Sequence, residues 1–166
     1  MDTTTSSASP HDTRTAGMPA AAGSPATATL AVANCFLVVD DHDAALAFYR
    51  DVLGFTVTQD VSMGDHRWLS VATPTQPELE ITIQSVGGGP GTSDEDRAAI
   101  DALLAKGLMS PLIFGCDDVD ALFEHVAASG AEVLQEPTDQ FYGVRDCAFR
   151  DPAGNLLRFK TALPQD

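Results

Sequence analysis

The first patterned region of the chain predicts a buried strand followed by an amphipathic helix. Residues 31–41, AVANCFLVVDD, are mostly apolar and rich in β-branched side chains, which is typical of a strand buried on both faces. Asp41 can cap a helix over 42–53, and Gly54 can end that helix in a left-handed conformation. The stripe that this helix would turn inward consists of Ala45, Phe48, Tyr49 and Val52.

The same order of elements is expected again in the second half of the chain. Three strand candidates follow the first helix, at 55–61, 66–72 and 78–84. In the second half an apolar strand precedes Asp118, a second N-cap, and Gly130 ends the helix that begins there. Three further strand candidates lie at 131–136, 144–150 and 155–161. Each half therefore predicts a β-α-β-β-β module, and the repeat indicates a weak internal duplication.

Two segments fall outside the repeated pattern. Residues 1–29 are mainly Thr, Ser, Ala, Pro and Gly, so we expect a disordered tail that has too little apolar surface to fold. Residues 86–109 begin with a Gly-rich loop, after which Ser93 can cap a helix that Gly107 ends. The prediction is a single α+β domain over 30–163, with module one at 31–85, this connector at 86–109 and module two at 110–162.

The charge of the chain excludes some partners. Asp and Glu number 24 against 9 Lys and Arg, which gives a formal charge of −15. This charge would repel nucleic acid and the anionic face of a membrane. No apolar run approaches the roughly 18 residues that cross a bilayer, and the N-terminus lacks the pattern of a secretion signal, so we expect a cytoplasmic protein. The acidic surface either maintains solubility or attracts a cationic ligand.

The three cysteines are expected to be reduced core residues. Cys35, Cys116 and Cys147 are odd in number and form no Cys-x-x-Cys motif, so they fit neither a disulfide framework nor a zinc site. Strand alternation would place Cys35 and Cys116 on the face that packs against the helices. Neither has a basic partner nearby in the sequence, which argues against a nucleophile.

Two motifs give the chain a resemblance to a known superfamily. The segments ALAFYRDVLGF in the first module and FRDPAGN in the second, together with the paired modules, resemble the vicinal oxygen chelate superfamily. That superfamily includes glyoxalase I, extradiol dioxygenases, fosfomycin-resistance enzymes and bleomycin-resistance proteins. The resemblance covers residues 32 to about 162 and implies a cupped, mostly antiparallel eight-stranded sheet around a cavity. Because this fold carries many activities, the function has to be argued from the site.

In the metal-dependent members of this superfamily, the metal ligands come from the first and fourth strands of each module. The resemblance places those positions at Asn34, Glu80, Pro111 and Arg158. Only Glu80 is a common ligand of divalent cations, since a proline has no side-chain donor and an arginine repels a cation. We therefore expect no metal ion and no cofactor. We also predict that Glu80 and Arg158 form an ion pair in place of the metal.

Aromatic and polar residues are expected to line the cup. Trp68 could form a flat wall for a planar ligand. The stretch FYGVRDCAFRDPAGN resembles a part of bleomycin-resistance proteins in which an aromatic residue before a glycine lines the drug groove, which points at Tyr142. The candidate ligand-binding residues are Asn34, Phe36, His66, Arg67, Trp68, Glu80, Ile113, Tyr142, Arg145 and Arg158.

Two functions are the main candidates, and a pure scaffold is a third, favoured if the cavity is filled by its own side chains. The first is a metal-independent protein of the bleomycin-resistance type, expected to be a homodimer, that binds a small organic ligand such as a cationic or aromatic antibiotic. The second is a lyase, isomerase or dioxygenase that holds a metal ion or uses Glu80 as a general base. In that case Arg158 or Arg67 would steady the developing oxyanion. Glu80 is the one candidate for a catalytic residue.

Overall fold

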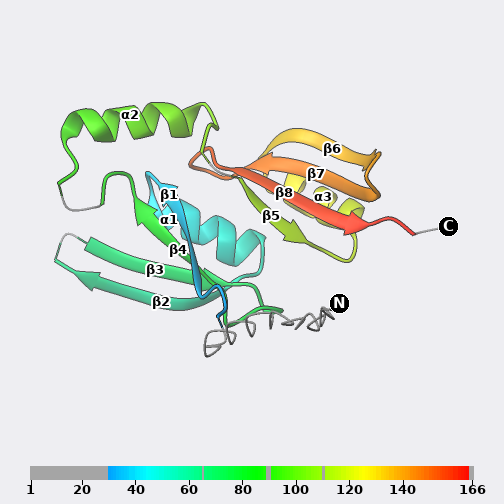
Figure 1. Cartoon of the computed structure of the whole chain (residues 1–166), viewed down its shortest axis with the longest axis horizontal. Helices are drawn as coiled ribbons and strands as arrows, with labels where there is room; N and C mark the ends of the chain where they lie inside the picture. The colour runs from blue at the N-terminus through cyan, green and yellow to red at the C-terminus, as the bar shows by residue number, and fades with distance from the viewer. Residues whose placement is uncertain (1–29, 65, 89–90, 110, 165–166) are drawn as a thin grey trace, which may run out of the picture. The chain divides into compact units, whose positions relative to one another are not determined.

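The computed structural model describes residues 30–64, 66–88, 91–109 and 111–164. Residues 1–29, for which the sequence predicts a disordered tail, lie outside the described residues. From Val32 onward the chain forms one structural unit. Within it, two successive modules each form a four-stranded sheet (Figure 1).

The first module contains a helical segment and four strands. It begins with β1 (Asn34–Val39), and α1 (His42–Leu46) continues directly into η1 (Ala47–Val52), a stretch of π-helix; β2 (Thr56–Met63), β3 (His66–Ala72) and β4 (Glu80–Ser85) follow. The spatial order of the strands is β1-β4-β3-β2. β1 runs parallel to β4, and the other neighbouring strands are antiparallel.

The second module repeats this arrangement after a connecting helix, α2 (Asp94–Ala105). Its elements are β5 (Leu112–Gly115), α3 (Val119–Ala128), β6 (Glu132–Gln140), β7 (Val144–Arg150) and β8 (Leu156–Ala162). The spatial order β5-β8-β7-β6 and the parallel pairing of β5 with β8 match the first module. The predicted α+β fold of two tandem β-α-β-β-β modules is therefore confirmed, in the form of two four-stranded sheets.

The helices begin at the capping residues that the sequence predicts. The carboxylate of Asp41 accepts hydrogen bonds from the backbone N–H groups of Asp43 and Ala44, at 2.8 and 3.0 Å. Asp118 caps α3 in the same way, and Ser93 forms a capping box at the start of α2. Such caps satisfy N–H groups that have no partner within the helix. The repeat of elements along the chain thus has a local physical cause.

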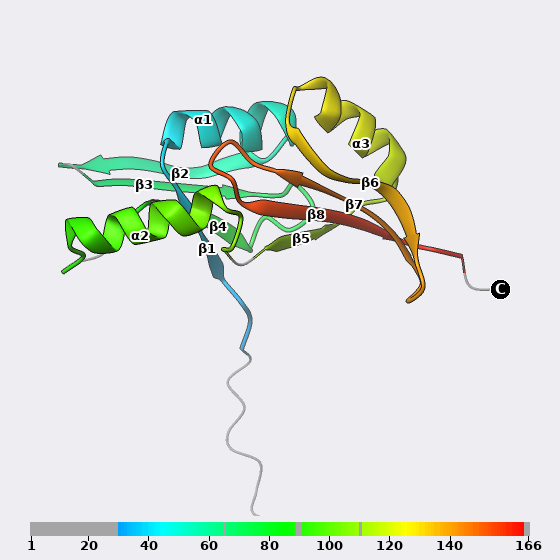
Figure 2. The ribbon, with the colours of Figure 1, turned by 90° about the horizontal axis from the view of Figure 1, so that it is seen from above.

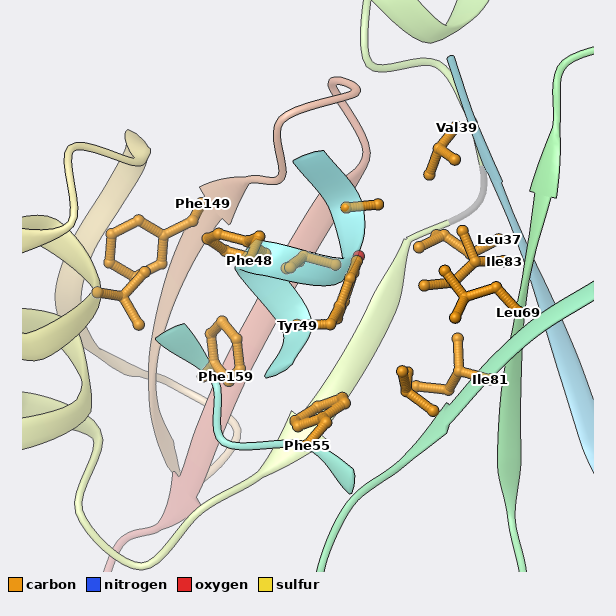
Figure 3. Packing of buried hydrophobic residues seen from close by; sticks show 14 of the residues in the cluster. Leu37, Val39, Phe48, Tyr49, Phe55, Leu69, Ile81, Ile83, Phe149 and Phe159 are labelled. Carbon is orange, nitrogen blue, oxygen red and sulfur yellow. The ribbon is translucent and has the colours of Figure 1, made fainter. Parts of the chain in front are cut away.

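Within the described part of the chain, each sheet has one face covered by helices and one face that no helix covers, called the open face below. Figure 2 shows α1 and α3 on the same side of the strands. In Figure 3 the side chains of Phe48 and Tyr49 lie between those of the first sheet, such as Ile83, and those of the second, such as Phe159, and all four belong to one buried core. Strand residues alternate between faces, so every second residue turns away from the helices. The open faces carry Asn34, Phe36, Trp68, Ser70, Glu80 and Thr82 in the first sheet, and Ile113, Gly115, Asp146, Ala148, Arg158 and Lys160 in the second.

A buried hydrogen-bond network joins the two motifs that carry the family resemblance. The hydroxyl of Tyr49 in η1 donates to Asp151 Oδ2 at 2.9 Å. Asp151 also accepts from the backbone N–H groups of Ala153 and Asn155, at 3.0 and 2.8 Å, and from Asn155 Nδ2 at 2.9 Å. The amide of Asn155 in turn donates to the carbonyl oxygen of Val38 at 2.9 Å. The β7–β8 turn is thus bound to both β1 and η1 of the first module.

The three cysteines lie in or against the core, as the sequence predicts. Cys35, Cys116 and Cys147 are free thiols; the first two pack against the core, and Cys147 is buried within it. None of the helices in the described ranges is both long and apolar enough to span a membrane.

Candidate functional site

The open face of the first sheet carries a chain of polar side chains. Asn34 Nδ2 donates to Glu80 Oε2 at 3.2 Å and to Thr82 Oγ1 at 3.1 Å. Thr82 Oγ1 shares a further hydrogen bond with Ser70 Oγ at 3.1 Å. Ser70 and Thr82 are buried, whereas Asn34 and Glu80 are half-buried. Among the described residues Glu80 forms no ion pair, and its side chain is held by the neutral amide of Asn34.

Two aromatic residues stand beside this chain. Phe36 is 55% exposed. Trp68 meets His66 edge to face, with ring centroids 6.4 Å apart. The indole Nε1 of Trp68 is buried and has no hydrogen-bond partner in the described part of the chain. Because a buried N–H without an acceptor is costly, an acceptor that reached this atom would be bound favourably.

A buried carboxylate organises the open face of the second sheet. Asp146 is 1% exposed and accepts hydrogen bonds from Gln135 Nε2 at 2.6 Å, Gln140 Nε2 at 2.8 Å, Arg158 Nη1 at 2.7 Å and the Tyr142 hydroxyl at 3.4 Å. Burial by itself would raise the pKa of Asp146, but the hydrogen bonds from Gln140, Arg158 and Gln135 outweigh it and lower that pKa. Asp146 is therefore ionised at neutral pH and is neutralised by one guanidinium.

Arg67 and Arg145, both predicted to line the cup, lie on the helix side of their sheets instead. The pairs are Arg67 with Asp43 and Asp60, at 2.6 and 2.8 Å, and Arg145 with Asp120 and Asp139, at 2.8 Å each. Adjacent strand residues turn to opposite faces, and in both strands the residue after the arginine turns to the open face. We therefore leave both arginines out of the site. In the alternative of a lyase, isomerase or dioxygenase, Arg67 is therefore not placed to stabilise an oxyanion on the open face.

Sequence reasoning misses Asp146 and the two glutamines that hold it. The adjacent Arg145 is predicted in place of Asp146, which is an error of one residue in the facing of the strand. The buried neighbours Cys147 and Phe149 carry the signal that could have corrected it. Their apolar side chains assign the odd-numbered residues of β7 to the helix side and Asp146 to the open face.

The predicted ion pair between Glu80 and Arg158 does not form. Arg158 Nη1 binds Asp146 Oδ2 at 2.7 Å, and Glu80 accepts from Asn34. The strand register explains the difference. Glu80 lies opposite Asn34 in the pair of β1 and β4, whereas Arg158 lies opposite Ile113 in the pair of β5 and β8. The two positions are thus not equivalent in their modules, although the sequence motifs around them look alike.

The four positions that the resemblance assigns to metal ligands do not fit a divalent ion. In the first sheet they supply one carboxylate, Glu80, and one neutral amide, Asn34. In the second, Pro111 has no side-chain donor, and Arg158 is a cation already bound to Asp146. No cluster of three or more His, Cys, Asp or Glu side chains in the described residues could hold a metal ion. The described open faces therefore lack a chelating set of donors.

Room for a ligand adjoins the second sheet. A groove of about 680 Å³ is lined by Gly115, Val144 and Lys160 of that sheet and by Thr75 of the loop between β3 and β4. This volume lies within the range of small-molecule sites, which is roughly 300 to 1,000 Å³. Three of the predicted wall residues are large and exposed: Phe36, Ile113 and Tyr142, at 55, 57 and 57%.

Comparison with known proteins identifies the family. The model of the glyoxalase/bleomycin resistance protein/dioxygenase superfamily matches residues 31–159. The crystal structure of UcmS2 is 32% identical, with a TM-score of 0.71, and the match covers 79% of this chain and 97% of that one. TnmS3, described as an antibiotic binding protein from Streptomyces sp. CB03234, is 24% identical, with a TM-score of 0.64 and coverage of 82% and 98%. The uncharacterized protein YurT of Bacillus subtilis (strain 168) is 27% identical over 122 residues, 74% of this chain and 91% of YurT. The chain belongs to the glyoxalase/bleomycin resistance protein/dioxygenase superfamily.

Proposed function

We propose that the protein binds a small aromatic organic molecule, such as an antibiotic, on its open faces and holds it without a metal ion. The proposal rests on the kinds of side chain that the open faces carry. Among the described residues they offer aromatic and hydrogen-bonding side chains but no chelating set of donors. The description of the structurally similar TnmS3 as an antibiotic binding protein supports the same class of ligand.

The aromatic preference follows from the exposed walls. Phe36 and Trp68 in the first sheet and Ile113 and Tyr142 in the second offer apolar surface to a planar ring. Burying such surface contributes about 25 cal/mol per Å². The formal charge of −15 would in addition raise the rate at which a cationic ligand meets the protein. We therefore expect this site to bind a cationic or an aromatic ligand.

The proposal includes a homodimer in the cytoplasm. Phe141, at the turn between β6 and β7, is 99% exposed and is not one of the residues assigned to the ligand. Large exposed apolar side chains of this kind are typical of an interface. Sedimentation of the purified protein tests the dimer, and a monomer at every concentration would contradict it.

Calorimetry against a panel of aromatic natural products, some of them basic, tests the proposed function. Trp68 is the single tryptophan of the chain and lies on an open face, so its fluorescence should change on binding. A ligand at 100 times its Kd should also stabilise the fold by about 2.7 kcal/mol. Both effects should be the same with and without EDTA. No heat and no thermal shift across the panel would overturn the proposal, as would binding that chelation abolishes.

A Trp68→Phe variant provides the control for the fluorescence experiment. It keeps an aromatic ring on the first sheet but removes the indole N–H and its emission, so calorimetric binding should persist with reduced affinity while the optical signal disappears.

A further inference from the structure

Two of the few cations of the chain stand together on the open face of the second sheet. Arg158 and Lys160 are next-but-one neighbours on β8, so their side chains project from the same face. The chain has 9 Lys and Arg against 24 Asp and Glu. Several of the other cationic side chains form ion pairs with aspartates, namely Arg50, Arg67 and Arg145. A pair of cations on this face therefore runs against the charge of the whole protein.

Arg158 is anchored through one nitrogen. Nη1 donates to Asp146 Oδ2 at 2.7 Å and to Gln135 Oε1 at 3.2 Å. Nε and Nη2 have no hydrogen-bond partner among the described residues, and the side chain is 28% exposed. Because Asp146 is buried and is itself held by two glutamine amides, the guanidinium is oriented before any ligand arrives.

Lys160 adds a second positive charge with space around it. It is exposed and forms no ion pair with any residue that the structure describes. Its partner on β5 is Gly115, where a Cβ would have nothing within 4 Å. Both residues line the groove of about 680 Å³, together with Asp117. A ligand group in the groove can thus approach the ammonium without displacing a protein side chain.

We infer that Arg158 and Lys160 form a subsite for an anionic oxygen group of the ligand, a carboxylate or an acidic phenol. The inference rests on the proposed function and narrows its ligand to aromatic molecules that carry such a group. Arg158 and Lys160 supply two cations against the buried carboxylate of Asp146, while the carboxylate of Asp117 also lines the groove and balances the second cation. Nε and Nη2 of a fixed guanidinium also offer two parallel donors, which match the two oxygens of a carboxylate.

Three probes that share one ring system test the subsite: naphthalene carboxylate, naphthalene carboxamide and naphthylmethylammonium. Each is titrated into the full chain by calorimetry at constant ionic strength. The carboxylate should bind about tenfold more tightly than the carboxamide, because charge-assisted hydrogen bonds are roughly twice as strong as neutral ones. The ammonium probe should bind most weakly, although the acidic surface as a whole would favour it.

Two variants test the contribution of the subsite to binding without unfolding the protein. Arg158→Lys keeps a cation for Asp146 but loses the parallel donors, so the preference for the carboxylate should fall to about threefold or less. Lys160→Gln leaves the buried pair untouched and should also reduce the preference. Arg145→Lys is the matched control, since it makes the same exchange in the neighbouring strand on the helix side, and it should leave the preference unchanged. Thermal unfolding confirms that each variant is folded.

Equal affinity of the carboxylate and the carboxamide would overturn the subsite and leave the ligand-binding function standing. A preference that survives both Arg158→Lys and Lys160→Gln, or tightest binding of the ammonium probe, would overturn it equally. Failure of all three probes to bind would overturn the subsite, whereas the ligand-binding function is tested separately by the panel of aromatic natural products.

Discussion

The two sheets differ at the open-face residue that follows a helix-side arginine. After Arg67 in the first sheet this residue is Trp68, whereas after Arg145 in the second sheet it is Asp146. The frame around these two residues is the same. In each module the arginine binds one aspartate in the first turn of the helix and one on the neighbouring strand. The open faces have thus diverged over a conserved arrangement of strands and helices.

The divergence extends to a second pair of positions. Phe36 and Ile113 lie the same number of residues before the capping aspartates of their modules. Their partners on the neighbouring parallel strands are Thr82 and Arg158, respectively. Where the second sheet has a buried carboxylate, it also has the guanidinium that binds it. Among its described residues the first sheet has no guanidinium on this face, and its carboxylate, Glu80, is only half-buried and accepts a hydrogen bond from the neutral amide of Asn34. The fully buried carboxylate, Asp146, is the one paired with a cation, because a buried charge alone would be costly.

The largest expected effect comes from breaking that pair. Arg158→Met leaves Asp146 buried without its cation and should lower the free energy of unfolding by about 3 kcal/mol, near the lower end for buried pairs because the guanidinium is partly exposed. Thr82→Val at the matching position of the first sheet should cost about 1 kcal/mol, the value of a neutral hydrogen bond. Urea unfolding measures both, and equal losses would contradict the comparison.

The link between the two sheets should have the next largest effect. Tyr49→Phe removes the hydroxyl that donates to the buried Asp151, and it should cost about 2 kcal/mol because Asp151 loses a buried donor. Unfolding should stay a single transition followed equally by circular dichroism and by Trp68 fluorescence. Two separate transitions would show that the sheets unfold independently.

The two buried aspartates should respond to pH in opposite directions. Burial opposes the ionisation of Asp146, but its hydrogen bonds give it a pKa below the ordinary value, so its contribution is present above that value and is lost as pH falls through the folded pKa. Burial raises the pKa of Asp151, so stability should decline as pH rises from the ordinary value to the raised one. Unfolding as a function of pH should show the first effect removed in Asp146→Asn and the second in Asp151→Asn. Parallel curves for both variants and the wild type would refute these assignments.

The smallest effect on stability is expected from the helix-side arginines that both modules share. Arg67→Met and Arg145→Met each remove ion pairs with largely exposed aspartates, so each should cost less than about 1 kcal/mol, and the two losses should be similar. Thermal unfolding at low and high salt measures this. A loss of several kcal/mol in one module alone would show that the two frames are not equivalent.

The fold could be predicted because its signals are local. Asp41, Ser93 and Asp118 act as caps where the sequence places them, and the stripe containing Phe48 and Tyr49 is buried. Capping and periodicity depend on a few neighbouring residues, so they can be recognised along the chain.

The site could be predicted only in part because it depends on facing and register. Arg145 was expected on the open face, and an error of one residue in β7 hid Asp146. The pairing of Arg158 depends on a partner strand, which the motif around it does not reveal. The bond from Tyr49 to Asp151 joins segments that are 102 residues apart, and nothing local indicates it.

Native mass spectrometry of the protein purified from its host without chelators tests the central claim most directly. If the open faces hold an organic molecule and lack a chelating set, each folded protomer should carry the mass of an organic ligand that is released on unfolding, with no transition metal. One Fe, Mn, Ni or Zn ion bound per folded protomer would contradict the account.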